Sequence, residues 1–460
     1  MNNLNSLEKL AKYFCSLENE FNLINYEING IKVWQYQRFR IFNEIAVLTN
    51  MYKRAHTKKV GLFDILKASP SLLYYSIFSN PLIGNYKRDY LIFGSGRKTN
   101  VNGRLVDIYA KYFIEKEHLK NYEIIEELIE NQHLTKEKKN RKHQDYQQIR
   151  TFILSKLNFF TFNKEQKNFI NKIENKIIHD LNISIDLSWL LKIGYLNFKY
   201  DYSFYNKLLQ KRNPKKIYLV CSYTYKKALI AAAKNLEIET IELQHGTIDK
   251  LHMGYSYPGQ NEIEYFPDKL YLFGQYWKET LQYPIENEKL VIKGFPYFNF
   301  QKKYYENIQK KTNQLLIISQ GTIGKKLSEI ICNEENLLKD FNVIYKLHPG
   351  EYARWKSEYP CLEKLARLKN IHIIDNNDIN IYEYFASSPY VIGIYSTAIY
   401  EALSFNCKVV LMDLPGVEYM AELVNKNITG LAESLNEAIN YFENSSSINY
   451  SSDYFFSEQN

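Results

Sequence analysis

Four clusters of polar residues follow apolar runs that each have the length of a buried β-strand. In open parallel sheets, ligands bind beyond the carboxyl ends of the strands, where loops lead into helices. Polar residues in this position after four separate strands therefore indicate a binding site that is built by the loops. The clusters are Gln244, His245, Gly246 and Thr247 after ETIEL; Ser319, Gln320, Gly321 and Thr322 after QLLII; His348, Pro349 and Gly350 after NVIYKL; and Tyr395, Ser396 and Thr397 after YVIGI.

The pair Ser396 and Thr397 opens the expected helix TAIYEALSF. Hydroxyl groups and the free backbone amides of a helix N-terminus form a seat for an anion such as phosphate, and the helix dipole strengthens it. Glu401 follows about one turn into this helix, where a carboxylate can accept hydrogen bonds from a ribose diol. Each residue also has a plainer interpretation, because Ser-Thr can simply cap the helix and Glu401 can be a solvated helix position.

Two more clusters suit the binding of a phosphate group. Histidine titrates near neutral pH, so His348 can hydrogen-bond or protonate a departing phosphate oxygen, and Pro349 ends the strand and holds the imidazole at its rim. Gly321 and Thr322 lie in ISQGTIG, where glycine lets the backbone approach a phosphate closely. A loop histidine without a role is the alternative for His348.

His245 ends its strand where a base would reach an acceptor hydroxyl. General-base help of this kind contributes about 10²–10⁴ in rate, and Gly246 leaves free the space that a side chain would fill. His252 either steadies the loop or meets substrate. Metal ligation by His245, Asp249 and His252 is an alternative by residue type, which the loop spacing does not enforce. The acidic stretch 375–378 is interpreted as an Asx-rich turn rather than a metal site.

The segments that position these residues alternate between strand and helix patterns. Such alternation indicates parallel strands joined by crossover helices. It begins near residue 215 and restarts after a polar, lysine-rich linker at about 301–313. We therefore predict an α/β protein of two Rossmann-like doubly wound domains that face each other across a cleft, at 86–305 and 306–443. Helices are expected at 324–334, 351–368, 379–386, 396–404 and 431–443.

The rest of the chain is expected to be mostly helical. Residues 1–85 carry apolar residues at three- and four-residue spacing and form a helical N-terminal region. Basic residues at 53–59 precede an aromatic stretch, and a cap on a core is favoured there over in-plane membrane attachment. Residues 115–210 are expected as a helical insertion in the first domain, and 444–460 as a flexible tail. The loop GSGRKTNVNGR is read as an ordinary turn, with anion binding as the alternative.

Composition limits the class of protein. The chain has 460 residues, of which 45% are hydrophobic and 24% charged, as in globular proteins of two to three domains. Five cysteines without CxxC pairing indicate neither a zinc site nor a disulfide framework. The net charge of +8 is interspersed and carries no nucleic-acid-binding signature, so no nucleic-acid partner is expected. Without a signal peptide or a membrane-spanning stretch, we predict a cytoplasmic protein, with peripheral attachment to the inner membrane face as an alternative.

Five motifs in chain order resemble those of bacterial GT-B-fold transferases that build capsules and lipopolysaccharides. They are LQHGTI, HMGY, KGFPYF, KLHPGE and GIYSTAIYEAL. The His-Pro and Ser/Thr motifs are similar to those of sialyltransferases and Kdo transferases, which use CMP-activated acid sugars. HGT, HP and YST are also similar to motifs of CDP-glycerol polymerases of teichoic acid synthesis. The resemblance covers roughly residues 215–425 and leaves the helical N-terminus unexplained.

The resemblance implies a role for each matching residue. His348 contacts the donor phosphate, Ser396 and Thr397 bind it, and Glu401 holds the nucleotide ribose. His245 faces the cleft from the acceptor-side domain. The sequence lacks the Asp/Glu-Asp/Glu-Gly motif that supplies the base in sialyltransferases, which weakens the sialic acid reading.

The function expected from these residues is a glycosyltransferase without metal or cofactor, which moves a CMP-activated acid sugar from its nucleotide to a glycan or glycolipid acceptor. The alternatives are a CDP-polyol phosphotransferase, a UDP-sugar-dependent transferase or epimerase, and a non-catalytic glycan- or nucleotide-binding partner.

Overall fold

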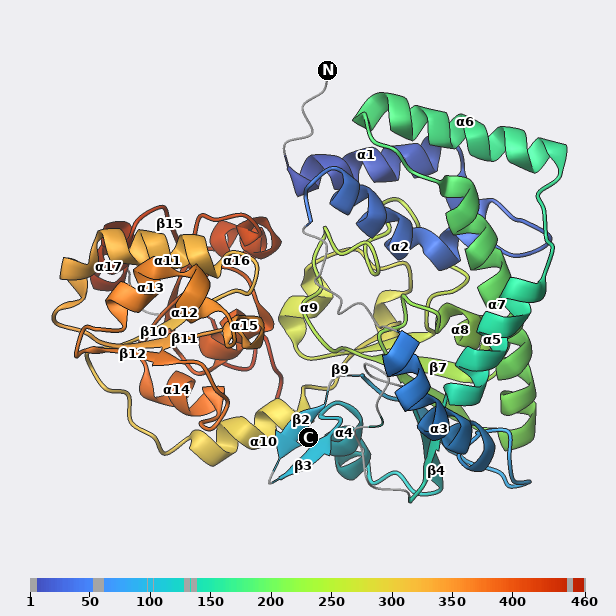
Figure 1. Ribbon diagram of the computed structural model, residues 1–460. Helices are drawn as coiled ribbons and strands as arrows, with labels where there is room; N and C mark the ends of the chain where they lie inside the picture. Colours follow the sequence, from blue (N-terminus) through green and yellow to red (C-terminus); the bar gives the residue numbers. More distant parts are fainter. Residues whose placement is uncertain are drawn as a thin grey trace. The chain divides into compact units, whose positions relative to one another are not determined.

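The computed structural model describes residues 6–52, 62–96, 98–101, 103–127, 133, 139–444 and 450–458, with the backbone alone for 62–69. The chain forms two compact units, shown as ribbons in Figure 1. Unit 1 comprises residues 1–272 and 281–291, and unit 2 comprises residues 273–280 and 292–460. The basic residues at 53–59, considered above for membrane attachment, lie outside the described part of the chain.

Unit 2 contains a six-stranded sheet in the order β12-β11-β10-β13-β14-β15. All five strand pairings are parallel. Numbered along the chain, this is the order 3-2-1-4-5-6 of a doubly wound Rossmann-like sheet, whose direction of winding reverses between β10 and β13. The strands are β10 (Gln314–Ile318), β11 (Asn342–Lys346), β12 (Ile371–Ile374), β13 (Tyr390–Gly393), β14 (Lys408–Met412) and β15 (Gly430–Ala432).

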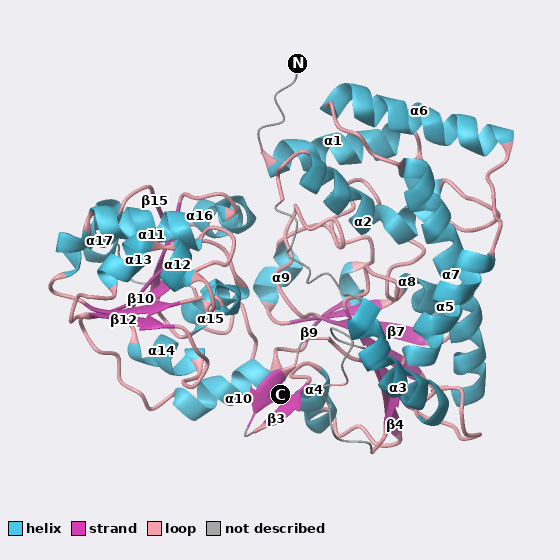
Figure 2. Cartoon of the chain, in the orientation of Figure 1, coloured by secondary structure: helices cyan, strands magenta, loops and turns pink. Residues whose placement is uncertain are grey.

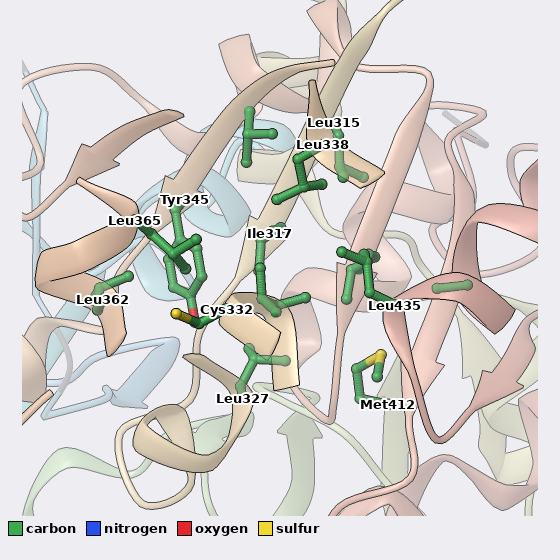
Figure 3. Packing of buried hydrophobic residues seen from close by; sticks show 14 of the residues in the cluster. Leu315, Ile317, Leu327, Cys332, Leu338, Tyr345, Leu362, Leu365, Met412 and Leu435 are labelled. Carbon is green, nitrogen blue, oxygen red and sulfur yellow. The ribbon is translucent and has the colours of Figure 1, made fainter. Parts of the chain in front are cut away.

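The sheet of unit 2 is buried on both faces, as a parallel sheet requires. Leu315 and Ile317 of β10 belong to one hydrophobic cluster, and Leu316 between them is equally buried but lies outside it. The cluster packs strands against α11 (Gly324–Asn333), α13 (Pro360–Leu365) and α17 (Leu435–Asn444), as Figure 3 shows for ten labelled residues. On the other face, α14 (Ile381–Ser387) contacts β10, and α15 (Thr397–Ser404) contacts β14. The other helices are α9 (Gln275–Glu279), α10 (Pro296–Tyr305), α12 (Trp355–Glu358) and α16 (Ala421–Asn425).

Unit 1 contains a seven-stranded sheet in the order β5-β4-β1-β6-β7-β8-β9. Apart from the short β2–β3 hairpin, this order is again 3-2-1-4-5-6, with β9 added at the edge. The predicted fold class, two doubly wound parallel α/β sheets with a helical N-terminal extension, is thus confirmed (Figure 2). The strands are β1 (Tyr90–Phe93), β2 (Thr99–Val101), β3 (Arg104–Val106), β4 (Tyr122–Glu126), β5 (Arg141–His143), β6 (Lys216–Val220), β7 (Glu239–Leu243), β8 (Lys269–Leu272) and β9 (Leu290–Ile292).

The helices of unit 1 are mostly those that the sequence predicts. β4 and β5, however, lie inside the segment 115–210, for which the sequence predicts helices. Charged residues hide the strand pattern, since β4 contains Glu123 and Glu126 and the edge strand β5 reads Arg-Lys-His. The helices are α1 (Leu7–Glu20), α2 (Val33–Leu48), α3 (Leu62–Phe78), α4 (Ala110–Lys116), α5 (Asp145–Leu157), α6 (Lys164–Leu181), α7 (Leu187–Arg212) and α8 (Lys227–Asn235).

The helical N-terminal region is part of unit 1 rather than a separate body. α2 packs against α7, and its fully buried Arg38 forms an ion pair with Glu18 of α1 at 2.7 Å. The Arg38 guanidinium also donates to the backbone carbonyl oxygens of Met253 and Ser256, the latter at 2.8 Å. α2 is therefore tied directly to the loop that follows β7. Among the described helices, none combines the length and the apolar character that crossing a bilayer requires.

The segment 450–458 is packed into unit 2, although the sequence predicts a flexible tail from residue 444. Phe455 and Phe456 are fully buried, and the indole of Trp277 donates to the carbonyl oxygen of Phe455 at 2.7 Å. The backbone amide of Ser457 donates to the carbonyl oxygen of Phe273. These contacts place residues 273–280 in unit 2. The prediction fails because two phenylalanines outweigh the serines and asparagines around them.

Replacing Phe456 by alanine tests this packing. The ring of Phe456 lies 4.2 Å from that of Phe298 and 5.4 Å from that of Phe273, centroid to centroid. We expect Phe456→Ala to lower the free energy of unfolding by about 3–5 kcal/mol in urea titrations, because it leaves a cavity. The matched control is Phe300→Ala on α10, whose side chain is 54% exposed, and its change should stay within about 0.5 kcal/mol. Equal effects of the two changes would contradict the packing.

Candidate functional site

The candidate site in unit 2 consists of the loops that follow three adjacent strands. β11, β10 and β13 are neighbours in the sheet, so the loops 347–351, 319–322 and 394–397 emerge at the same edge. The reversal of winding lies between β10 and β13, which is where open α/β sheets bind ligands. The structure therefore brings together the donor-side residues that the sequence predicts from three separate motifs.

A buried carboxylate, Glu351, joins the loops after β10 and β11. It accepts a hydrogen bond from the Ser319 hydroxyl at 2.9 Å and another from the backbone amide of His348 at 2.7 Å. Its side chain is fully buried. A Cβ atom at Gly324 would lie within 2 Å of this carboxylate, so the first turn of α11 has room only for glycine. Ser319, expected to contact the donor, is itself buried and holds Glu351.

The imidazole of His348 sits directly over Gly321. A Cβ atom at Gly321 would lie 2.9 Å from His348 Nδ1, so a side chain there would displace the imidazole. His348 Nδ1 accepts from the backbone amide of Gly350 at 3.1 Å, and Pro349 occupies the first position of the short helix that His348 caps. Arg354 closes the arrangement by donating to the carbonyl oxygens of Gly321 and Gly350. His348 remains exposed at this edge.

The loops after β10 and β13 are joined through Tyr395. The amide group of Gln320 donates to the carbonyl oxygen of Tyr395 at 2.7 Å, and the hydroxyl groups of Thr322 and Tyr395 lie 3.1 Å apart. The ring of Tyr395 leaves no room for a side chain at Gly416, which has a φ of +104°. Gln320 therefore connects two loops, while Thr322 is exposed.

Ser396 caps α15, and its hydroxyl accepts from the backbone amide of Ala398 at 3.0 Å. This is the plain capping interpretation, and it also turns the helix N-terminus with the partly exposed Thr397 toward the loop edge. Glu401, one turn into α15, accepts from the Tyr382 hydroxyl at 3.1 Å. Burial raises the pKa of Glu401 to about 7, and that one hydrogen bond offsets little of the effect.

A lysine lies close to the same edge. Lys346, the last residue of β11, is buried and donates to the carbonyl oxygen of Asn376 at 2.6 Å and to the hydroxyl group of Tyr352. Burial lowers the pKa of Lys346 to about 8. The stretch 375–378 forms the expected Asx turn, since the Asn376 side chain accepts from the backbone amide of Asp378 at 3.1 Å.

The candidate site in unit 1 is the loop after β7, where tyrosines surround His245. His245 Nε2 lies 3.2 Å from the Tyr223 hydroxyl, and Nδ1 lies 3.5 Å from the Tyr255 hydroxyl. The Tyr109 hydroxyl donates to the backbone carbonyl oxygen of His245 at 2.7 Å. The ring of His245 is partly exposed and fixed from three sides.

A buried carboxylate stands behind His245. Glu242 of β7 accepts from the Tyr255 hydroxyl at 2.6 Å and from the backbone amide of Ser222 at 3.0 Å. Its other carboxylate oxygen has no hydrogen-bond partner within the described part of the chain, and burial raises the pKa of the group. The hydroxyl of Tyr255 therefore links a buried carboxyl to an imidazole.

Other residues of this loop shape it. Gln244, predicted on the acceptor side, is buried, and its side-chain amide donates to the carbonyl oxygen of Gly246 at 2.9 Å, so it positions the turn. A side chain at Gly246 would meet nothing within 4 Å, which agrees with the expected open space beside His245. Thr247 is partly exposed.

His252 steadies the loop. Its ring stacks on Phe39 of α2, with ring centroids 5.3 Å apart, and its Nδ1 accepts from the backbone amide of Gly254 at 3.2 Å. Burial lowers the pKa of His252 to about 4 and raises that of Asp249, which accepts from the backbone amide of Leu251, to about 7. Within the described ranges, no three His, Cys, Asp or Glu residues form a group that could hold a metal ion, so His245, Asp249 and His252 are not such a set.

The glycine-rich loop after β1 is filled by the protein's own groups. Asp107 accepts from the backbone amides of Ser95 and Tyr109, at 2.6 and 3.0 Å, and Lys98 pairs with Glu126 at 2.8 Å. The anion that the loop binds is thus the carboxylate of Asp107, which supports its interpretation as a structural turn. Arg97 of this loop lies outside the described residues.

No family model matches the chain, and no curated protein matches it. Among solved structures, it is similar to UDP-GlcNAc 2-epimerase from Methanocaldococcus jannaschii, with a TM-score of 0.46 and 13% identity over 80% of this chain and 96% of that one. UDP-GlcNAc 2-epimerase from Neisseria meningitidis bound to UDP-GlcNAc gives a TM-score of 0.45 and 13% identity over 77% and 91%. Acinetobacter baumannii MurG gives a TM-score of 0.43 and 9% identity over 77% and 90%.

The two sheet orders of the chain itself define its class, an α/β protein with two Rossmann-like units.

The sequence does not reveal the residues that hold both sites in place. A charged residue inside an apolar strand is the available signal for Glu242, and a carboxylate three residues after a strand-end histidine is the signal for Glu351. Tyr255, Tyr223 and Tyr395 carry no such signal, because the chain contains 40 tyrosines. Only the fold distinguishes these three from the others.

Glu351→Gln should loosen the unit 2 loops. The amide of glutamine has only one oxygen, so it cannot accept from both Ser319 and the His348 backbone amide as the carboxylate does. We expect a loss of about 1–3 kcal/mol in the free energy of unfolding. The control is Glu358→Gln, which removes a 2.8 Å ion pair between Arg354 and a carboxylate that is half exposed. This control should change stability by less than about 1 kcal/mol. An equal, small effect of both changes would contradict the role of Glu351.

Glu401 should make stability depend on pH. Its pKa in the folded protein, about 7, lies above its ordinary value of 4.5. The protonated carboxyl group of Glu401 therefore favours the folded state. Its contribution to the free energy of unfolding is lost as the pH rises through about 7. Relative to Glu401→Gln, the wild type should lose up to about 3 kcal/mol between pH 5 and pH 8. Urea unfolding of both proteins across this range measures the difference, in which the shared contributions of Asp249 and Asp201 cancel. A difference that is independent of pH would refute the buried carboxyl.

Proposed function

We propose that the protein is a glycosyltransferase that moves a sugar from a nucleotide donor to an acceptor of surface-polysaccharide synthesis. The observation that supports the proposal is the unit 2 edge, where the loops after β11, β10 and β13 are joined to one another and carry His348 and the N-terminus of α15 at the same edge of the sheet. A helix N-terminus with a nearby imidazole suits a phosphate that gains charge as it leaves.

The donor phosphate occupies the loop edge in this proposal. Because His348 Nδ1 accepts from the Gly350 amide, the neutral ring carries its proton on Nε2, which can donate to a phosphate oxygen. Thr397 and the first amides of α15 supply further donors, and Thr322 lies on the adjacent loop. With charge stabilised in this way, the proposed reaction uses no metal ion.

The nucleoside portion extends toward Glu401. With a pKa of about 7, its carboxyl group is protonated in part of the molecules at neutral pH. It can then donate to one ribose hydroxyl and accept from another. Lys346 offers a second positive group near this edge, and its lowered pKa leaves it charged in most molecules at neutral pH.

His245 is proposed as the general base for the acceptor hydroxyl. The Tyr255 hydroxyl donates to Glu242, so its oxygen is oriented to accept from His245 Nδ1–H, and Nε2 then carries the lone pair. Nε2 contacts the Tyr223 hydroxyl. An acceptor hydroxyl would either take the place of the Tyr223 hydroxyl or pass its proton to Nε2 through it. Glu242 compensates the charge that the imidazole acquires, as a buried carboxylate behind a catalytic histidine does.

For the donor, we propose a CMP-activated acid sugar such as sialic acid or Kdo, on the strength of the His-Pro and Ser/Thr motifs. The HGT, HP and YST motifs favour as a second candidate a CDP-polyol phosphotransferase of teichoic acid type. A UDP-sugar 2-epimerase differs from both in that it needs no acceptor, and an idle binding partner would bind without turnover.

Transfer assays on four variants test these roles. We expect His348→Ala, His245→Ala and Glu401→Ala each to lower turnover by about 10²–10⁴ while the protein stays folded by circular dichroism. The matched control is His372→Ala, which changes an exposed histidine on β12 of unit 2 and should leave turnover unchanged. Wild-type turnover in His348→Ala and Glu401→Ala would refute the site in unit 2.

Thermal unfolding with CMP, CDP, UDP and GDP identifies the donor, since a ligand that binds only the native state raises the melting temperature. The largest shift with CMP would support the acid-sugar donor, and the largest shift with UDP would overturn it. His348→Ala should reduce the shift, whereas His372→Ala should not.

A further inference from the structure

Two helices of unit 1 turn apolar faces toward solvent. α3 and α5 pack against each other (Figure 1). Both carry large apolar side chains that are exposed. We call this set the apolar surface: Leu73, Tyr74, Ile77 and Phe78 on α3, Phe152, Ile153 and Leu157 on α5, and Phe159 directly after it. Clustered apolar side chains of this size on a protein surface mark a site of interaction.

α5 has the reverse of the usual amphipathic arrangement. Its polar side chains point inward, where the hydroxyl of Thr151 donates to Asp201 of α7 at 2.6 Å and that of Ser155 donates to Asn197 at 3.1 Å. Phe152 and Leu157 are 64% and 66% exposed. A helix at a water-facing surface normally buries its apolar stripe. The outer face of α5 therefore matches an apolar environment rather than water.

Basic residues lie on α5 and follow it in the sequence. The ammonium group of Lys156 lies 5.9 Å from the centre of the Phe152 ring, and the exposed Lys164 and Lys167 follow on α6. From Tyr146 to Lys172 the sequence has only one acidic residue, Glu165. The basic residues in this range are Arg150, Lys156, Lys164, Lys167 and Lys172.

A cavity of about 380 Å³ adjoins Phe159 in the chain, and its lining contains aromatic and basic residues together with Asp186 and neutral polar residues. Phe160 and the half-exposed Trp189 line it together with Lys167 and Lys192. Aromatic rings with lysines at their edge are typical of groups that sit at the boundary between lipid tails and headgroups.

We propose that the apolar surface inserts into the interface of a bilayer that contains anionic lipids. The apolar side chains of α3 and α5 would enter the region between headgroups and acyl chains, while Lys156, Lys164 and Lys167 meet lipid phosphates. A second copy of the chain fits less well, because a twofold contact would bring the basic residues of both copies into one interface. The proposal concerns binding alone and does not depend on the proposed transfer reaction.

Co-sedimentation of the full chain with lipid vesicles tests the proposal. We expect binding to vesicles of phosphatidylcholine mixed with phosphatidylglycerol, and much weaker binding to phosphatidylcholine alone or at high salt. Phe152→Asn combined with Leu157→Gln, and separately Ile77→Gln combined with Phe78→Asn, should each weaken binding at least ~10-fold. Lys156→Glu combined with Lys164→Glu should remove the preference for phosphatidylglycerol.

The matched control is Phe300→Asn combined with Tyr304→Gln on α10 of unit 2, which removes two equally exposed aromatic rings at another place. Its vesicle binding should equal that of the wild type. Absence of wild-type binding to the anionic vesicles would overturn the proposal, as would wild-type binding by the α5 variant. The proposal would also be overturned if light scattering showed a dimer of the wild type, if the α5 variant were a monomer, and if neither protein bound vesicles. The surface would then belong to a contact with a second copy.

Discussion

A single buried carboxylate, that of Glu351, holds the unit 2 loop edge together. Its two hydrogen bonds tie the loop after β10 to the loop after β11 and fix the backbone amide of His348. A buried charge is costly unless it is hydrogen-bonded. Removing one hydrogen-bond partner of a buried carboxylate therefore destabilises the fold more than replacing both groups by apolar ones. The same physics that makes Glu351 expensive to bury therefore keeps both loops in one arrangement.

Unit 1 uses a related solution. Glu242 is buried on the strand that ends at His245 and reaches the imidazole through the hydroxyl of Tyr255. In both units a glutamate that is fully buried stands behind a partly or fully exposed histidine. The difference lies in the atom that is held. Glu351 accepts from the backbone amide of His348, whereas Glu242 reaches the ring of His245 through the hydroxyl of Tyr255.

The sequence predicts the sheets well, because parallel strands that are buried on both faces read as continuous apolar runs. β10, β11, β13 and β14 are of this kind, whereas β4, β5 and β15 are short or carry charges and are missed. The motif residues of unit 2 come together for the same reason, since the ends of neighbouring parallel strands share an edge. The sequence does not predict which of these residues face a ligand and which hold the loops in place. Whether Ser319 faces a ligand or holds Glu351 depends on a contact between residues 32 positions apart.

The chain passes between the two units three times, at 272/273, 280/281 and 291/292. A gene cut at residue 305, the predicted end of the first domain, falls inside unit 2 and would not yield two independently folding fragments. The downstream fragment would retain Phe455 and Phe456 but lack Phe273 and Trp277, which cover them. It would therefore expose an apolar surface that favours aggregation. Separate production of unit 2 requires instead a chain in which a short linker joins residues 273–280 directly to residue 292.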